Sequence, residues 1–307
     1  MNGFRVLKPG VLSLMQDSGR WGQHALGLTT GGAMDGEAFF WANRLVGNHS
    51  DTTAMEVAQG GLQLECGGTT TLAVTGAAMP LRINGQTKAL WRSYQIHAGD
   101  RVELGHAVCG LRAYLAVAGG FGVEPFLGST STVLREGIGE PVKEGQWLAC
   151  GEPAESNWAL PMDQVPRYEP AVSLRVVQGY QAAEFSGEAR GHFYGSPFKV
   201  SPRSDRMGYR LEGHAVAAPT GDRLSEGIAY GAVQVPPDGQ PIILLNDRQT
   251  IGGYPKLGAV LSIDCWKLAQ CLPGETVGFK PITLAAAQQL VGEAAEVRAS
   301  VRLKRCE

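Results

Sequence analysis

Residues 231–245 read GAVQVPPDGQPIILL, and this stretch decides the fold class. Two short apolar runs flank the tetrapeptide PPDG at residues 236–239. Proline presets the backbone for a turn and glycine tolerates a positive φ angle, so the tetrapeptide predicts a chain reversal. Apolar runs of this length on both sides of a turn are typical of a β-hairpin.

The same pattern recurs along most of the chain. Short apolar or alternating runs such as FRVLK (4–8), GLQLEC (61–66) and TTLAVTG (70–76) are bounded by turn-forming residues. The chain contains 42 glycines without a fixed period, which fits many tight turns between strands. The sequence therefore predicts a mainly β protein, built as two mostly antiparallel barrels or sandwiches.

A few helices are expected at the edges of the sheets. Asp35 is placed to cap a helix over residues 36–46, which Gly47 would end. Asp264 is similarly expected to cap a short helix over residues 264–272, and Thr283 to open a last helix.

A stretch rich in proline and polar residues, GEPAESNWALPMDQVPRYEP (151–170), has no sustained hydrophobic period. Such a stretch is typical of a linker. We therefore expect a first domain over residues 1–155 and a second over residues 165–307.

The composition argues against several classes of partner. Lys and Arg number 27 against 29 Asp and Glu, so the formal net charge of −2 gives no footprint for nucleic acid or an anionic membrane. Charged residues make up 18% of the chain, below the usual ~25%, which hints at surface covered by a partner chain. The six cysteines form no C-x-x-C pair, and no signal peptide or membrane span is evident, so a cytoplasmic protein with reduced thiols is expected.

Common catalytic motifs are missing from the sequence. No P-loop, G-x-G-x-x-G, G-x-S-x-G or H-E-x-x-H motif occurs, and the histidines are not spaced as metal ligands. We therefore expect no metal site.

Three glycine-rich stretches concentrate polar side chains where strands end, a usual place for functional sites. They are MQDSGRWGQHALGLTTGGAMD (15–35), VSPRSDRMGYRLEG (200–213) and QPIILLNDRQTIGGYPK (240–256). The candidate binding residues are Gln16, Asp17, Arg20, Tyr209, Thr250, Gly252, Gly253 and Tyr254, and the candidate catalytic residues are Asp205, Arg206, Asp247, Arg248 and Gln249.

Arg206 and Arg248 each follow an aspartate, and in an extended segment neighbouring side chains point to opposite sides. One charge could then face a ligand while the other anchors the loop. The guanidinium group of arginine can bind a carboxylate or a phosphate through paired hydrogen bonds. The backbone amides of the glycines could stabilise an oxyanion. The alternative is that Asp17, Asp35 and Asp205 are turn or cap residues with the arginines as their salt-bridge partners. For the third stretch, the alternative is a glycine hairpin with a run of solvated charges.

These three stretches, together with ANRLVGN (42–48) and LGSTST (127–132), resemble the biotin-dependent carboxyltransferase family, also called the allophanate hydrolase subunit 2 or KipA family. The resemblance runs nearly end to end and implies cyclophilin-like β-barrel domains, two in this chain. It also implies a companion protein, which we expect to be a separate chain. Biotin carriers of the family have a lysine in an A-M-K-M motif; the nearest stretch here is AMEV (54–57), with Glu56, so biotin is not expected on this chain.

The length of the chain most closely resembles the C subunits of bacterial 5-oxoprolinases. That resemblance implies an assembly with a KipI-like B subunit, together with a LamB/YcsF-type A subunit, which uses ATP to open 5-oxoproline to L-glutamate. Arg206 and Arg248 would then bind an anionic substrate or phosphate. Gln249, Thr250 and the amides of 252 and 253 would support an oxyanion, Asp205 or Asp247 would move a proton, and Tyr209 or Tyr254 would wall the pocket.

Two alternatives come from the same family. One is a carboxyltransferase component that acts on urea or a related amide. The other is a KipA-like regulator that binds a kinase-inhibitor protein without catalysis. The genes beside this one would discriminate between the assembly and the regulator.

Overall fold

The computed structural model describes residues 2–221 and 223–306, which form two compact units. Unit 1 comprises Met1–Trp21, Gly31–Tyr168 and Arg302–Glu307. Unit 2 comprises Gly22–Thr30 and Glu169–Val301. The chain thus passes from unit 1 to unit 2 after Tyr168, near the end of the proline-rich stretch at residues 151–170. Two domains with the bounds 1–155 and 165–307 remain a prediction.

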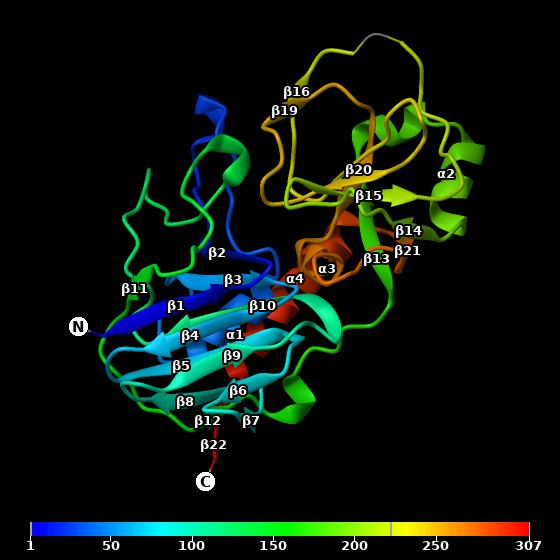
Figure 1. Cartoon of the computed structure of the whole chain (residues 1–307). Helices are drawn as coiled ribbons and strands as arrows, with labels where there is room; N and C mark the ends of the chain where they lie inside the picture. The colour runs from blue at the N-terminus through cyan, green and yellow to red at the C-terminus, as the bar shows by residue number, and fades with distance from the viewer. Residues whose placement is uncertain (1, 222, 307) are drawn as a thin grey trace. The chain divides into compact units, whose positions relative to one another are not determined.

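Unit 1 contains two antiparallel sheets, visible in Figure 1 as neighbouring arrows from blue to green. The first sheet has the order β11 (Trp147–Ala149), β1 (Gly3–Pro9), β4 (Leu62–Cys66), β9 (Arg101–Leu104), β6 (Leu81–Ile83) and β7 (Gln86–Lys88). The second has the order β2 (Leu12–Gln16), β3 (Ala54–Ala58), β10 (Cys109–Val117), β5 (Thr70–Ala78), β8 (Arg92–Ile96), β12 (Trp158–Ala159) and β22 (Lys304–Arg305).

The core of unit 1 is formed by apolar side chains from both sheets. Val6 and Leu64 come from the first sheet, Leu72 and Leu115 from the second, and each is at most 1% exposed. Burying a side chain of this size stabilises the fold by about 1.5–3 kcal/mol. The two sheets are thus held face to face by a shared apolar layer.

Helix α1 (Gly36–Leu45) packs on β5 and β10 of unit 1. The Asp35 carboxylate accepts hydrogen bonds from the amides of Glu37 and Ala38, both at 3.1 Å, so the predicted cap is confirmed. The buried face of the helix includes Phe39, Ala42 and Leu45.

Unit 2 contains a closed barrel, drawn in green, yellow and orange in Figure 1. Its strands follow the order β13 (Ala171–Gln178), β20 (Lys256–Val260), β17 (Ala232–Gln234), β18 (Ile242–Leu244), β15 (Gly208–Glu212), β14 (Phe198–Val200) and β21 (Thr276–Ile282). All pairs are antiparallel except β13 with β21. A small additional sheet pairs β16 (Glu226–Gly227) with β19 (Ile251–Gly252).

The hairpin predicted from residues 231–245 is confirmed. Strands β17 and β18 pair antiparallel with Val233 opposite Ile243, and the Gly239 amide donates to the Pro236 carbonyl at 2.9 Å. Gly239 has a φ of 73°, a left-handed conformation that favours glycine. The PPDG sequence therefore produces the turn that its residue types indicate.

Unit 2 also contains the helices α2 (Gly187–Gly195), α3 (Ser262–Leu268) and α4 (Leu284–Ser300). The Thr283 hydroxyl accepts from the Ala286 amide at 3.3 Å, as predicted. The predicted cap at Asp264 is wrong, because α3 begins at Ser262. The Asp264 carboxylate instead receives Nε and Nη2 of Arg175, both at 2.7 Å, and a bidentate charged pair is stronger than a capping bond.

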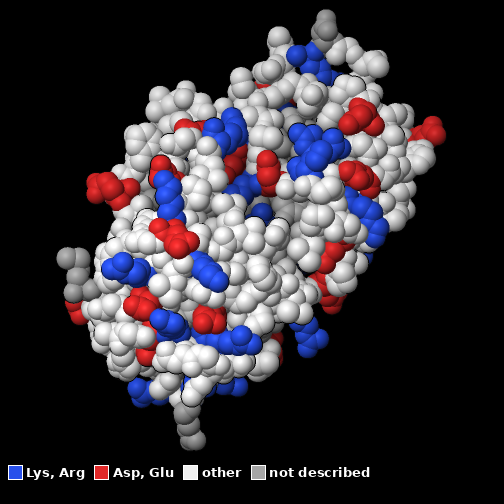
Figure 2. Space-filling view, viewed as in Figure 1, with Lys and Arg blue, Asp and Glu red and all other residues white. Residues whose placement is uncertain are grey.

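The mainly β class is thus confirmed. Of the two predicted barrels, the described residues show one closed barrel, in unit 2, whereas unit 1 forms two sheets. On the face shown in Figure 2, cationic and anionic side chains are interspersed, in keeping with the small net charge. Within residues 2–221 and 223–306, no helix has the length and apolar character needed to span a membrane.

Candidate functional site

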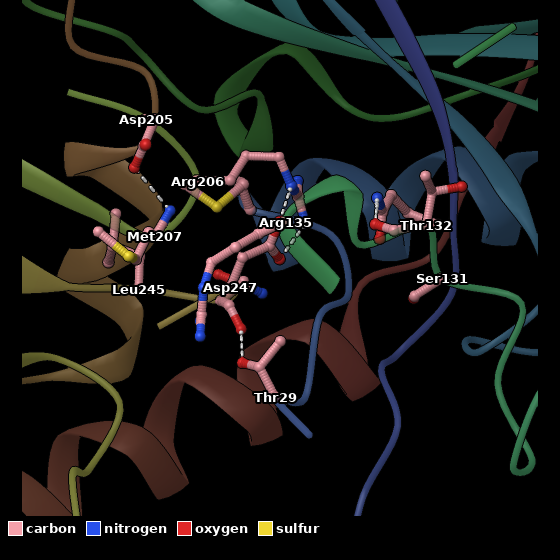
Figure 3. Close-up of polar contacts among 12 residues, drawn as sticks. Thr29, Ser131, Thr132, Arg135, Asp205, Arg206, Met207, Leu245 and Asp247 are labelled. Atoms are coloured by element: carbon pink, nitrogen blue, oxygen red, sulfur yellow. Dashed lines mark hydrogen bonds and ion pairs between the residues drawn. The ribbon is translucent and has the colours of Figure 1, made fainter. Parts of the chain in front are cut away.

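Two of the predicted stretches are cross-linked in unit 2 by a buried ion pair. Arg206 donates from Nε and Nη2 to the two carboxylate oxygens of Asp247 at 2.9 and 3.0 Å (Figure 3). The side chains are only 10% and 7% exposed. The Asp247 amide also donates to the Arg206 carbonyl at 3.0 Å, so backbone and side chains hold the same junction. The cation and the carboxylate of this pair neutralise each other.

Asp205 lies beside this junction and shapes a turn. Its Oδ1 accepts a hydrogen bond from the amide of Met207 at 2.9 Å (Figure 3). It also accepts one from the amide of Gly208 at 3.2 Å. This is the usual contact of an aspartate that stabilises the backbone just after it. The turn brings the chain into β15 next to β18.

Arg248 is directed at backbone carbonyls. Its Nε donates to the Ile228 carbonyl at 3.1 Å and its Nη1 to the Leu245 carbonyl at 3.2 Å. The guanidinium carbon lies 5.8 Å from the centre of the Tyr230 ring. Burial lowers the pKa of the Arg248 guanidinium. These contacts tie the start of the loop that follows β18 to the segment before β17.

Tyr209 belongs to the buried layer of the barrel. It is 1% exposed, and its hydroxyl donates to the carbonyls of Ala269 at 3.2 Å and Cys271 at 3.4 Å. It pairs with Ile243 across β15 and β18. Since neighbouring residues of a strand face opposite sides, Gly208 and Arg210 face the side of the sheet that Tyr209 does not.

That other side carries a cavity of about 300 Å³. Of the predicted residues, Gln249 and Tyr254 line it, and Arg206 and Arg248 are not among its lining residues. The lining residues are Met207, Gly208, Arg210, Gln234, Pro236, Pro237, Asp238, Ile242, Leu244, Gln249 and Tyr254. Strands β15, β17 and β18 therefore form the floor, and the loops around residues 236–238 and 249–254 form the rim.

Gln234 is a lining residue that sequence reasoning missed. It is 1% exposed, and its Nε2 has no hydrogen-bond partner among the described residues. Gln249 Oε1 is likewise buried without such a partner. An amide side chain inside an apolar strand, between Val233 and Val235, was the available signal, because a buried polar group needs a partner.

The glycines of the loop lie beside these two amides. A Cβ added to Gly252 would lie 2.5 Å from Ile228 Cδ1 and 2.8 Å from Gln234 Nε2, so no larger residue fits without a shift. A Cβ on Gly253 would meet nothing nearer than 3.6 Å. The Thr250 carbonyl accepts the Ile228 amide at 3.0 Å, which ties the loop to the segment before β17.

The predicted residues of unit 1 form a separate polar group. The Asp17 carboxylate accepts the hydroxyls of Ser129 at 2.7 Å and Ser131 at 2.5 Å, and the amides of Gly19 at 2.8 Å and Thr130 at 2.7 Å. Burial alone raises the pKa of Asp17, but these hydrogen bonds outweigh it and hold the pKa below its ordinary value. The Asp17 carboxylate thus binds hydroxyl and amide groups of the loop at residues 128–132.

Arg20 binds the same loop from its carbonyl side. Its Nε donates to the Phe126 carbonyl at 2.8 Å, and its Nη2 to the carbonyls of Ser129 and Ser131, both at 3.2 Å. Arg20 and this loop line a cavity of about 460 Å³. Gln16 lies at the end of β2, where its Nε2 donates to the Thr132 carbonyl at 2.9 Å. All three predicted residues therefore contact one loop.

Glu56, in the stretch of this chain that comes nearest to an A-M-K-M motif, lies inside β3 and is 3% exposed. Its carboxylate accepts the Tyr114 hydroxyl at 2.8 Å and the Met34 amide at 2.9 Å, with Arg112 Nε 3.6 Å away. A prosthetic arm needs a mobile, exposed attachment point, so the residues at this position do not fit biotin.

Comparison with known proteins agrees with this organisation. A family model described as the carboxyltransferase domain, subdomain A and B, matches residues 26–281. The chain is 36% identical to the C subunit of 5-oxoprolinase from Escherichia coli (strain K12), over 91% of each chain.

Two solved structures show the same fold. The structure of TTHA0988 is 35% identical, with a TM-score of 0.85, over 91% of this chain and 55% of that one. The Kluyveromyces lactis urea carboxylase is 28% identical, with a TM-score of 0.88, over 96% of this chain and 28% of that one. The chain thus spans about half of the first solved chain and less of the second. It belongs to the carboxyltransferase-domain family, subdomain A and B.

Proposed function

We propose that the chain is the C subunit of an ATP-dependent 5-oxoprolinase, which opens the lactam of 5-oxoproline to L-glutamate. The observation that carries this proposal is its likeness to the C subunit of the E. coli 5-oxoprolinase, which extends over 91% of both chains. A likeness over nearly the whole of both proteins leaves no large part of either unmatched. ATP enters this proposal as a substrate of the assembly, and biotin is not attached at Glu56.

The proposal includes companion chains. A protein named as one subunit works within an assembly, and we propose a KipI-like B subunit, together with a LamB/YcsF-type A subunit, as the partners here. The low charged fraction of 18% is in keeping with covered surface. We also propose that the assembly works in the cytoplasm, where ATP is available.

The chemical task is to make an amide carbonyl reactive. Negative charge grows on its oxygen, and one preorganised donor lowers such a barrier by about 3–4 kcal/mol. We propose Gln249, Thr250 and the amides of Gly252 and Gly253 as the source of these donors. Tyr254 is 47% exposed and lines the cavity, so it can cover a bound substrate.

The arginines and aspartates take a positioning role in this proposal. Arg206 and Asp247 pair with each other, Arg248 binds carbonyls, and Asp205 holds a turn, so together they fix the loop that carries Gln249. Direct contact of these residues with substrate, and a role for Tyr209, Gln16, Asp17 or Arg20 in binding, stay predictions.

A second candidate is a component that transfers a carboxyl group to urea or a related amide. The TM-score of 0.88 to the K. lactis urea carboxylase favours it. Both candidates are tested by purifying the chain with its companion proteins and supplying ATP with either 5-oxoproline or urea. Glutamate formed only from 5-oxoproline supports the first proposal, whereas ATP use that depends on urea and bicarbonate supports the second.

A further inference from the structure

A short hairpin in unit 1 places a leucine in a backbone conformation that favours other residues. Phe126 and Ser129 form an antiparallel bridge, and each amide donates to the other residue's carbonyl, at 2.9 and 3.2 Å. Between them, Leu127 has a φ of 48° and Gly128 has a φ of 79°. Positive φ at both central residues is typical of a type I′ turn, which prefers Asn-Gly or Asp-Gly. Leu127 thus adopts a left-handed conformation that is unfavourable for its side chain.

Unit 1 also contains the preferred version of this turn. Strands β6 and β7 are joined by Asn84 and Gly85, whose φ angles are 53° and 76°. The chain therefore forms one type of turn twice, once with asparagine and once with leucine at the first central position. The turn itself does not require a leucine, so the use of Leu127 lies outside the hairpin.

The side chains at the hairpin are left open to solvent. Leu127 is 44% exposed and Phe126 is 50% exposed. Trp21, which follows the Arg20 that donates to the Phe126 carbonyl, is 72% exposed. Exposed apolar side chains that lie together mark interaction surfaces, and unfavourable backbone conformations are concentrated at functional positions. Both observations indicate that Leu127 is kept for a binding partner.

Two charged residues hold the base of this hairpin. Arg20 Nε donates to the Phe126 carbonyl at 2.8 Å, and its guanidinium carbon lies 5.5 Å from the centre of the Phe126 ring. The Asp17 carboxylate accepts the Ser129 hydroxyl at 2.7 Å on the other side of the turn. A hairpin fixed in this way loses little conformational entropy when a partner covers it.

The cavity of about 460 Å³ in unit 1 borders the hairpin, because Phe126 is one of its lining residues. Its other apolar lining residues are Met15, Val123, Ile138 and Pro141. Three carboxylates also line it, and Glu140 forms an ion pair with Lys143. Glu124 and Glu144 are exposed and form no ion pair within residues 2–221 and 223–306. The cavity thus combines an apolar lining with accessible negative charge.

We propose that the hairpin at residues 126–129 and this cavity form the docking surface for a companion chain of the assembly. The partner presents an apolar pocket for Leu127, and a lysine or arginine that enters the cavity toward Glu124 and Glu144. The aliphatic part of that side chain packs on the apolar lining while its charge meets the carboxylates. This inference rests on the proposed function for the existence of a companion chain.

Other occupants explain less of the surface. A small cation in the cavity would leave the side chains of Phe126 and Leu127 exposed. A second copy of this chain in a two-fold dimer would place the same surface against itself, so that Glu124 and Glu144 would face like charges. A companion chain with a basic side chain beside an apolar pocket satisfies both parts.

The variant Leu127→Asn is informative because folding and docking should respond to it in opposite directions. Asparagine suits the type I′ turn, so the variant should unfold at a higher urea concentration than the wild type. The apolar anchor is lost, so the Kd for the companion chain should rise about 10-fold or more. Surface plasmon resonance measures this Kd, with each chain immobilised and the purified companion proteins supplied singly and together.

The matched control is Asn84→Leu, which makes the reverse exchange in the same type of turn. It should unfold at a lower urea concentration, also because Asn84 Nδ2 loses its hydrogen bond to Asp100, and it should keep the wild-type Kd. This control shows whether a change in stability alone alters docking.

The charge of the cavity is tested by the double variant Glu124→Gln with Glu144→Gln. Its Kd should rise about 10-fold at low salt and depend less on ionic strength than the wild-type Kd, because two charges that attract the partner are removed. Glu296→Gln, on the exposed side of α4, is the control for loss of a carboxylate and should match the wild type.

The docking surface and the proposed function fail separately. If the complete wild-type assembly forms no glutamate but Leu127→Asn still weakens binding of a companion protein, the proposed function fails and the docking surface is supported. If the assembly is active and Leu127→Asn keeps the wild-type Kd, the docking surface is overturned.

Three further results would also overturn the docking surface. The first is destabilisation of the chain by Leu127→Asn, since the turn would then need leucine for folding. The second is the absence of any companion protein that binds the wild-type chain. The third is self-association of the wild-type chain in sedimentation that Leu127→Asn abolishes, because the occupant would then be a second copy.

Discussion

The ion pair between Arg206 and Asp247 gives the sharpest prediction for the stability of unit 2. Its bonds of 2.9 and 3.0 Å join side chains that are 10% and 7% exposed. Removing one member of a buried pair costs about 3–5 kcal/mol, because the other charge stays buried without it. Asp247→Ala should therefore destabilise unit 2 by about that amount.

Hydrogen exchange followed by mass spectrometry measures this locally. A change of 1.4 kcal/mol is about tenfold in an equilibrium constant, so protection of peptides spanning residues 205–208 and 245–248 should fall roughly 10²–10⁴-fold. Peptides from β1 and β4 in unit 1 provide an internal reference. Glu293→Ala, which removes an exposed carboxylate of α4, is the control for loss of a negative charge.

A double-mutant cycle then assigns the effect to the pair. In an Arg206→Met background, Asp247→Ala should cost less than about 1 kcal/mol, since the buried cation is already gone. The conclusion that the Arg206–Asp247 pair joins the loops at residues 205–208 and 245–248 would be refuted by either of two results. One is an equal loss of stability from Asp247→Ala in both backgrounds, and the other is a loss below about 1 kcal/mol for Asp247→Ala alone.

Three further changes test other parts of the molecule. Burial raises the pKa of Asp264, but the hydrogen bonds to Arg175 outweigh it and hold the pKa below the ordinary value of 3.8. The ionised Asp264 therefore stabilises the folded protein above pH 3.8, and this stabilisation is lost as the pH falls through the lower pKa of the folded state. Asp264→Asn should therefore destabilise the protein by about 3 kcal/mol at pH 7 and flatten the acid side of a urea-unfolding series, and an unchanged acid slope would contradict this. Gly239→Ala should lower the free energy of unfolding by about 1–2 kcal/mol or more, because its φ is 73° and the Cβ would lie 2.9 Å from the Val216 amide nitrogen; an unchanged urea midpoint would be inconsistent with that turn. Ser131→Ala should cost about 1.5–3 kcal/mol by the same assay, since a hydrogen bond to a charged carboxylate is lost, and a neutral result would argue against that network.

Local features of the fold were predictable because they depend on neighbouring residues. The PPDG turn, the cap at Asp35 and the cap at Thr283 each follow from the chemistry of a few adjacent side chains. Asp264 looks the same in sequence, yet its carboxylate binds Arg175, 89 residues away. Which partner an aspartate takes is decided by tertiary structure.

The candidate site shows the same limit. Charged residues next to glycine were easy to identify, but the pairing of Arg206 with Asp247 spans 41 residues and could not be read from adjacency. Gln234 was overlooked because it stands in an apolar strand and belongs to no motif. Register alone shows that it shares a face with Arg210, which makes it a candidate binding residue.

The most direct test of the proposed function is an omission experiment. The three proteins of the assembly are purified separately and combined with ATP and 5-oxoproline, with and without this chain, while ADP and L-glutamate are measured together. We expect both products to form in the complete mixture and glutamate to vanish when this chain is left out. Undiminished glutamate formation without it, or none in the complete mixture, would contradict its assignment to a 5-oxoprolinase.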